Sequence, residues 1–130
     1  MISHYQSNLE NFIHWANTTP NNLYLRQPHG DQYIDYSYAA AALEVKKIAH
    51  FLQRHLTEGS KNVGILAKNS AHWMMSDLAI MMAGFVSVPI YTSLTAHAIE
   101  QVLNHSESKA IILGKLDNYK AIKKGIPKIP

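Results

Sequence analysis

The sequence predicts an α/β fold: a parallel three-stranded βαβαβ core flanked by helices, with an N-terminal helix and a β-hairpin before it. Three short apolar runs, residues 62–67, 85–91 and 110–113, have the composition of buried strands. The stretches 70–83 and 95–105, which separate them, have the composition of helices. Short apolar strands alternating with helices are typical of a parallel sheet that is covered on both faces.

The helix expected over residues 70–83 is apolar nearly all round. Its polar side chains are only Ser70, His72, Ser76 and Asp77. A helix of this kind is buried on more than one side, which a small domain rarely achieves. This helix therefore indicates that the chain is part of a larger structure.

The elements before the core follow from periodicity and turn residues. Leu9, Phe12, Ile13 and Ala16 lie on one face of a helix that stops before Pro20. Residues 23–26 and 32–36 flank residues 28–31, which predicts a β-hairpin with a loop longer than two residues.

A long amphipathic helix follows the hairpin. Ser37 is its expected N-cap and Gly59 its expected C-terminal residue, because glycine adopts the left-handed conformation at low cost. Its predicted buried stripe is Ala41, Val45, Ile48, Ala49, Leu52 and Leu56.

The elements after the second core strand are shorter. Thr95 is the expected cap of a helix that buries Ile99, Val102 and Leu103. A short basic helix is expected at residues 119–124, and residues 125–130 are read as a linker or the start of another strand.

Composition excludes several functional classes. The chain has 130 residues, a net charge of +3 and no cysteine, so thiolate catalysis and cysteine-rich zinc sites are ruled out for this stretch. The pairs His50/His55 and His97/His105 lack the i, i+4 spacing of a helical metal pair, so no metal site is expected. The lysines at 120, 123, 124 and 128 are not interleaved with aromatic residues, so no nucleic-acid partner is expected.

A transmembrane segment is not expected either. The apolar run 71–91 approaches the length that spans a bilayer, but Asp77 lies within it and Gly84 and Pro89 interrupt it. The N-terminus lacks a basic region followed by an apolar one, so no signal peptide is expected. A cytoplasmic protein follows from this reading.

The junction 67–70 is the first candidate site. It could hold an anion through free helix N–H groups, but capping by Asn69 or Ser70 is the favoured interpretation. No dinucleotide fingerprint, P-loop or G-x-S-x-G nucleophile motif accompanies it.

Three further candidates are two single residues and one group. Asp77 could be a buried general base, although a place on the one wet strip of its helix, or a bond to a neighbouring loop, is favoured. Tyr91, at the carboxyl end of an expected parallel strand, is the best candidate for a ligand contact. A lipid pocket could be lined by Trp73, Met74, Met75, Met81 and Met82, but core packing by adaptable methionine side chains is the favoured interpretation.

Several blocks of the sequence resemble the AMP-forming acyl-CoA synthetases of the adenylate-forming superfamily. Residues 33–39 (YIDYSYA) are similar to an opening Y-T-Y-x-E-L block. Residues 63–69, Trp73, 77–79 and 83–91 are similar to the block V-a-I-l-x-x-N…W…D-L-A…a-G-x-v-x-V-P-i-Y, and residues 99–103 and 108–112 continue it. The ending Pro89-Ile90-Tyr91 is more similar to the long-chain fatty acid branch than to the acetate or peptide-synthetase branches.

The resemblance implies that residues 1–130 are an N-terminal subdomain of a larger adenylate-forming domain. The family forms an acyl-adenylate from ATP and a fatty acid with Mg²⁺, and CoA then displaces AMP. Its phosphate loop, its adenine and ribose motifs and its catalytic lysine lie beyond this length, so no catalytic, cofactor-binding or metal-binding residue is assigned. The usual Gly-Asp pair before the first core strand is replaced by Lys61-Asn62.

Two hypotheses for function remain. The first is an N-terminal fragment of a long-chain fatty acid–CoA ligase, a scaffold that is inactive alone. Its partners would be the remainder of the synthetase or a second copy bound through exposed apolar surface, and the full-length form could be peripheral to a membrane. The alternative is a free-standing α/β binding or interaction module without catalysis.

Overall fold

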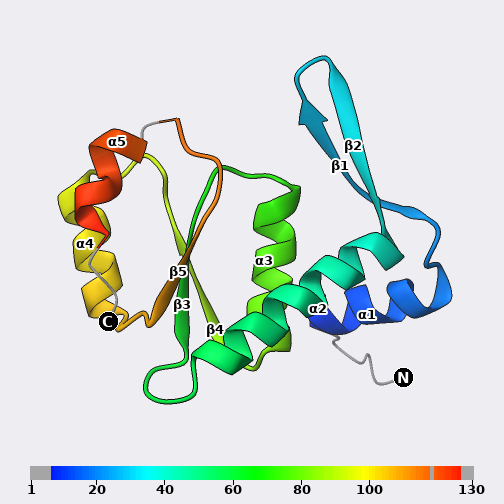
Figure 1. Ribbon diagram of the computed structural model, residues 1–130, viewed down its shortest axis with the longest axis horizontal. Coiled ribbons are helices and arrows are strands. Elements are labelled where there is room, and N and C mark those ends of the chain that lie inside the picture. The colour runs from blue at the N-terminus through cyan, green and yellow to red at the C-terminus, as the bar shows by residue number, and fades with distance from the viewer. Residues whose placement is uncertain (1–6, 118, 127–130) are drawn as a thin grey trace, which may run out of the picture.

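The computed structural model describes residues 7–117 and 119–126 (Figure 1). In chain order its helices and strands are α1 (Asn8–Thr18), β1 (Leu23–His29), β2 (Gln32–Ser37), α2 (Tyr38–His55), β3 (Asn62–Leu66), α3 (Ala71–Met82), β4 (Val86–Ile90), α4 (Ala96–His105), β5 (Ala110–Leu113), α5 (Tyr119–Ile122) and a 3₁₀ turn, Lys123–Gly125. The expectations for residues 127–130 lie outside the described residues.

The core is a parallel sheet with strand order β4-β3-β5, which confirms the predicted βαβαβ arrangement. On the central strand, Val63 aligns with Ser87 on one side and Ala110 on the other. Figure 1 shows α3 and α2 on one side of this sheet and α4 and α5 on the other. Helices on both faces explain why the central strand β3 is apolar along most of its length.

Two hydrophobic clusters hold these layers together. The first packs Val63 and Ile65 against α1, α2 and α3. The second packs Leu66 and Ile90 against α4 and α5, where Ile122 is buried. The helix α3 is buried on more than one side, as its composition predicts: it packs on β3 and also on α1 and α2.

Side-chain caps start the helices where the sequence places them. Each capping hydroxyl accepts a hydrogen bond from the backbone N–H three residues later: Ser37 from Ala40 (3.1 Å), Ser70 from Trp73 (3.1 Å) and Thr95 from Ala98 (3.2 Å). The three predicted N-termini are therefore confirmed, and each orphan N–H so satisfied stabilises its helix by about 1 kcal/mol.

The predicted hairpin exists, but the prediction of a loop longer than two residues is wrong. His29 pairs with Gln32, which leaves Gly30 and Asp31 as the turn. Gly30 has φ +63°, as the first central residue of a type II′ turn requires. The prediction placed Pro28 in the loop, but this residue belongs to β1. No third strand among the described residues pairs with the hairpin, so the outer edge of β1 tolerates the N–H that proline lacks.

The predicted end of the long helix is also wrong. The last residue of α2 is His55, and the N–H of Leu56 closes the final turn on the carbonyl of Leu52. Gly59 does adopt a left-handed conformation, with φ +87°, but in the loop that leads to β3. Its positive φ shapes this loop, not the helix cap.

Candidate functional site

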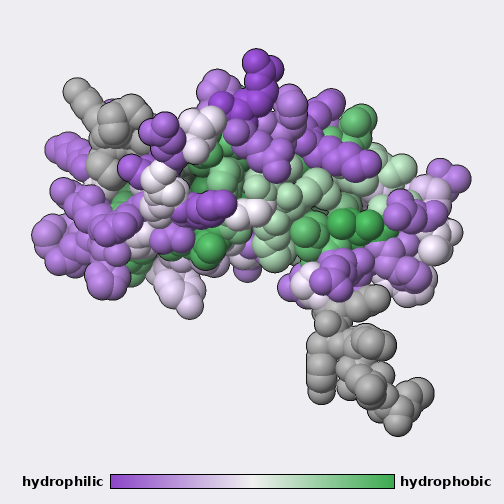
Figure 2. Space-filling view, turned by 90° about the horizontal axis from the view of Figure 1, so that it is seen from below, coloured by the Kyte–Doolittle hydropathy of each residue, from purple (hydrophilic) through white to green (hydrophobic). Residues whose placement is uncertain are grey.

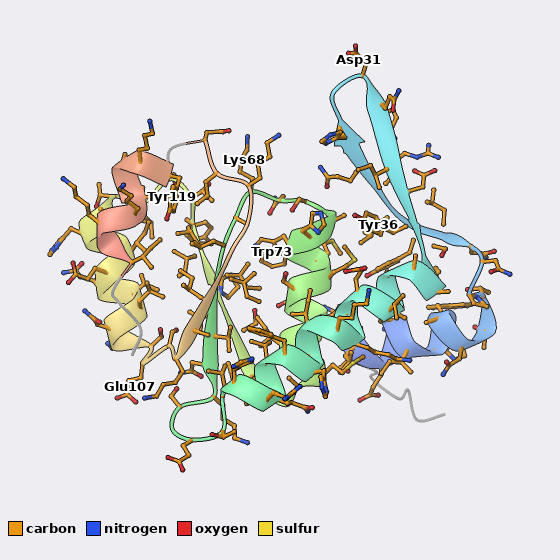
Figure 3. All side chains as sticks on the ribbon, in the orientation of Figure 1. Asp31, Tyr36, Lys68, Trp73, Glu107 and Tyr119 are labelled. Carbon is orange, nitrogen blue, oxygen red and sulfur yellow. The ribbon has the colours of Figure 1, made fainter. Side chains whose placement is uncertain are left out.

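The carboxyl ends of the three parallel strands meet at one edge of the sheet, which we call the carboxyl edge. Its loops are residues 67–70, 91–95 and 114–117. Figure 3 shows Lys68 at this edge, the upper end of the sheet in that view. Open parallel sheets bind ligands outside this edge, so these loops form the candidate site.

Tyr91 lies at the carboxyl edge, directly after the last residue of β4. Its side chain is 78% exposed. Its carbonyl oxygen accepts a hydrogen bond from the N–H of Leu94 at 3.3 Å, which turns the chain towards α4. The residue predicted to contact a ligand is thus held in a backbone turn while its ring remains accessible.

An ion pair joins two loops of the carboxyl edge. Nζ of Lys68 lies 2.7 Å from Oδ2 of Asp117, and both side chains are largely exposed. The backbone N–H of Lys68 also donates to the carbonyl of Lys115 at 3.0 Å. The hydrogen bond from Lys68, together with its charge, lowers the pKa of the Asp117 carboxyl. Sequence reasoning missed this pair, because nothing in local spacing relates residues 49 positions apart.

At the N-terminus of α3, side chains already bond two of the backbone N–H groups that an anion could otherwise use. The N–H of Ala71 donates to Oε1 of Gln27 at 2.7 Å, and the N–H of Trp73 donates to the hydroxyl of Ser70. Capping was the favoured interpretation of this junction and is confirmed for Ser70. The sequence does not predict that the side chain of Gln27, on β1, accepts the hydrogen bond from Ala71.

A cavity of about 590 Å³ opens between the hairpin and the start of α3. Leu25, Pro28, Trp73 and Met74 contribute apolar surface to its wall. The one cation there, Arg26, is engaged by the carboxylate of Asp35 through two hydrogen bonds of 2.7 and 3.1 Å. A neutralised charge in a mainly apolar wall suits a hydrocarbon group better than a phosphate.

The methionine-rich helix divides between core and surface. Met75 is buried, while Met81 and Met82 pack partly buried against the first cluster. Met74 is 44% exposed and, like Trp73, lines cavities. Core packing therefore accounts for most of these residues, with Trp73 and Met74 on cavity walls.

Asp77 is only partly buried and lies on the wall of a second, smaller cavity beside α1. Its carboxylate makes no hydrogen bond or ion pair with another described residue. Of the two favoured readings, this position agrees with the wet strip and not with a bond to a neighbouring loop, because the carboxylate is partly exposed and has no partner among the described residues.

Residues 7–117 and 119–126 contain no cluster of three or more His, Asp or Glu side chains that could hold a metal ion. Within the same residues, no helix has both the length and the apolar character needed to cross a bilayer.

The comparisons with known proteins agree with this architecture. The family model of the AMP-binding enzymes matches residues 12–129. Long chain acyl-CoA synthetase 7, peroxisomal, of Arabidopsis thaliana is 33% identical over 107 residues, which cover 78% of this chain and 15% of that protein. Fatty acyl-CoA synthetase A of Dictyostelium discoideum is 38% identical over 77 residues, or 58% of this chain and 11% of that protein.

Among solved structures, coronafacic acid ligase from Pectobacterium brasiliense superposes with a TM-score of 0.80 at 20% identity. The match covers 93% of this chain and 23% of that one, so it shows a shared fold. The chain spans only 11–15% of the length of the two synthetases that it matches. The family match over most of its length nevertheless establishes that the chain belongs to the AMP-binding enzyme family, as an N-terminal portion of that α/β fold.

Proposed function

We propose that residues 1–130 form the N-terminal subdomain of a long-chain fatty acid–CoA ligase and act as a scaffold on one flank of its acyl and nucleotide site. The observation that carries this proposal is the family match over residues 12–129, together with relatives named as acyl-CoA synthetases. The block 83–91 supports the long-chain branch, because it ends in Pro89-Ile90-Tyr91. Its last residue lies at the carboxyl edge.

It follows from this proposal that residues 1–130 alone do not catalyse adenylate formation. Adenylate formation requires ATP, Mg²⁺ and positioned cationic groups that stabilise the phosphoryl transfer, and CoA is needed for the second step. At the carboxyl edge, Lys68 is already paired with Asp117, and the N–H groups of Ala71 and Trp73 at the start of α3 are already bonded. The groups that handle the phosphates would come from other parts of a full-length ligase.

The direct test is ATP–pyrophosphate exchange with palmitate and Mg²⁺. The 130-residue chain should give no exchange above the enzyme-free background, while a full-length long-chain acyl-CoA synthetase assayed in parallel should give strong exchange. Exchange that depends on palmitate and is catalysed by this chain alone would overturn the claim of inactivity. The family assignment would survive that result.

We also propose that Tyr91 contacts the ligand of the full-length site. Support comes from its position after β4 and its accessible ring. The test follows the ring resonances of Tyr91 by NMR while palmitate or AMP is added. Tyr33, which is 65% exposed on the hairpin, is the control for nonspecific effects. Equal shifts at both tyrosines would count against a ligand contact at Tyr91.

The proposed partner is the remainder of the synthetase or, in its absence, a second copy of this chain. Figure 2, seen from below, shows hydrophobic side chains gathered over the part of the molecule that α1 and α2 occupy. A groove of about 410 Å³ lies there, and its wall includes Ile13, Leu43 and Met82. Light scattering should show association that Leu43→Glu weakens, because the exposed side chain of Leu43 contributes to this surface.

A free-standing binding or interaction module remains the second candidate. The observation in its favour is that helices cover both faces of the parallel sheet, so the described part has a core on each side. A monomeric chain with a single cooperative unfolding transition would favour the module. Association through the surface around the groove of Ile13, Leu43 and Met82 would favour the subdomain. For the subdomain we propose a cytoplasmic location and, in the full-length protein, peripheral contact with membranes.

A further inference from the structure

A small cavity of about 270 Å³ lies where α1, β1, α2 and α3 meet, on the α1 side of the molecule. We call it the aromatic cavity, because five aromatic rings and one carboxylate dominate its wall. These residues are Phe12, Trp15, Tyr24, Tyr38, Trp73 and Asp77. No residue of the loops that form the carboxyl edge lines this cavity.

Three of the five rings of the aromatic cavity, those of Phe12, Tyr24 and Tyr38, pack on one another. The ring centroids of Phe12 and Tyr24 are 5.1 Å apart, and those of Tyr24 and Tyr38 are 4.6 Å apart. Burial, reinforced by the neighbouring phenol of Tyr38, raises the pKa of Tyr24, as expected in surroundings of low polarity. This part of the wall is thus preformed, and a ligand would not have to order it.

Asp77 supplies the one charge among the residues that line the aromatic cavity. Its side chain is half-buried and has no hydrogen-bond or ion-pair partner among the described residues. The other polar groups on the wall are the neutral side chains of Asn8 and Asn11 and the two phenols. The wall therefore has a net negative charge and no cation of its own to balance it.

We propose that the aromatic cavity binds a quaternary ammonium group, held by the aromatic faces and by the carboxylate of Asp77. The negative face of an aromatic ring attracts a cation, and a methylated ammonium gives up its water at low cost. A carboxylate near the rings adds a direct charge interaction. A fatty acid carboxylate would be repelled by Asp77, and a single carboxylate is too few ligands for a divalent metal ion.

Binding at this cavity can be observed without a label. The chain contains two tryptophans, Trp15 and Trp73, and both line the aromatic cavity. Titration with tetramethylammonium or choline should change the intrinsic fluorescence saturably, in the millimolar range. Neohexanol, in which carbon replaces the charged nitrogen of choline, should bind at least about fivefold more weakly. Equal affinity for choline and neohexanol, or no saturable response to either cation, would overturn the proposal.

Two variants of equal charge locate the effect. Asp77→Asn should weaken binding of tetramethylammonium by about fivefold or more, because it removes the carboxylate while keeping the side-chain shape. Asp31→Asn removes the same charge at the tip of the hairpin, far from Trp73 in Figure 3, and should leave the affinity unchanged. If both variants bind as tightly as the native chain, the carboxylate has no role and the proposal fails.

Replacement of Trp15 tests the aromatic part. Trp15 is 47% exposed, so its replacement should not disturb the core. Trp15→Phe should retain most of the affinity and Trp15→Leu should lose it, with the remaining fluorescence of Trp73 as the readout. Equal affinity in the two variants would contradict a cation–π contact at this position.

A quaternary ammonium could belong to a free metabolite or to the choline headgroup of a lipid. Co-sedimentation with vesicles of phosphatidylcholine distinguishes the two, with vesicles of phosphatidylglycerol as the control. Retention on phosphatidylcholine that Asp77→Asn abolishes points to the headgroup. Binding of choline without vesicle retention points to the free cation, and either result supports the proposed chemistry.

Discussion

The side-chain oxygen Oε1 of Gln27 accepts a hydrogen bond from the backbone N–H of Ala71 at 2.7 Å. This contact fastens the β1–β2 hairpin to the first turn of α3 and satisfies an N–H that the helix leaves free. It also borders the larger cavity, whose wall contains both residues. The position of the hairpin relative to α3 therefore depends in part on one amide side chain.

We expect Gln27→Ala to lower the free energy of unfolding by about 1 kcal/mol, because the N–H of Ala71 loses its acceptor. Gln27→Glu should retain most of the stability, since a carboxylate at a helix N-terminus is favoured by the helix dipole. Urea denaturation measures both values. Faster hydrogen exchange of the hairpin amides in Gln27→Ala, but not in Gln32→Ala at the start of β2, would attribute the effect to the hydrogen bond with α3.

The ion pair of the carboxyl edge should be visible in the titration of Asp117. The pKa of Asp117 lies below its ordinary value of 3.8 because of Lys68, so the ionised pair contributes stability that is lost as the pH falls through the folded-state pKa. We expect Lys68→Ala to raise the pKa of Asp117, as measured by NMR of the carboxyl carbon. Asp35, whose pKa is lowered by Arg26, should titrate unchanged in that variant.

Burial raises the pKa of Tyr24 above 10.0, which predicts a loss of stability at alkaline pH. At a pH between the pKa of Tyr24 in the unfolded chain and its pKa in the folded chain, the phenol is ionised in the unfolded state and protonated in the folded state. The contribution of Tyr24 to the free energy of unfolding is therefore complete below the unfolded-state pKa and declines above it. Tyr24→Phe should flatten this decline in urea denaturation at pH values around and above 10. An equally steep decline in the variant would show that other groups cause it.

Two substitutions by alanine should show that the buried core, and not the carboxyl edge, determines the stability of the fold. Ile65 is fully buried on the central strand, so Ile65→Ala should cost about 2–5 kcal/mol of the free energy of unfolding. Tyr91→Ala should change it by less than about 0.5 kcal/mol, because the ring is exposed. Denaturant titrations of the two variants give the comparison. A large loss of stability in Tyr91→Ala would mean that the ring has a structural role.

Elements with a strong local pattern were predictable from sequence. The apolar runs fixed the parallel core, and the hydroxyls of Ser37 and Thr95 marked helix starts, because a cap acts on N–H groups only three residues away. The predictions were wrong at Pro28, which lies in β1 and not in the hairpin loop, and at Gly59, which lies beyond the end of α2. Both residues interrupt regular structure on average, and the tertiary setting decides whether they do so in a given place.

The candidate site was less predictable, since its contacts join distant parts of the chain. Tyr91 could be proposed as a ligand contact because the carboxyl end of a parallel strand can be read from the strand pattern. The bond between Gln27 and Ala71 and the pair of Lys68 with Asp117 span 44 and 49 residues, and no local spacing encodes them. The aromatic cavity likewise gathers rings from four separate elements.

The two borders of the parallel sheet differ in how well they could accept another strand. The N–H of Val86 points inward to the carbonyl of Lys61, so by alternation Ser87 and Pro89 face outward, and proline has no N–H to offer. On β5, the inward N–H of Lys109 leaves those of Ala110 and Ile112 facing outward as donors. Extension of the sheet by backbone pairing should therefore proceed from β5, while Pro89 discourages it along β4.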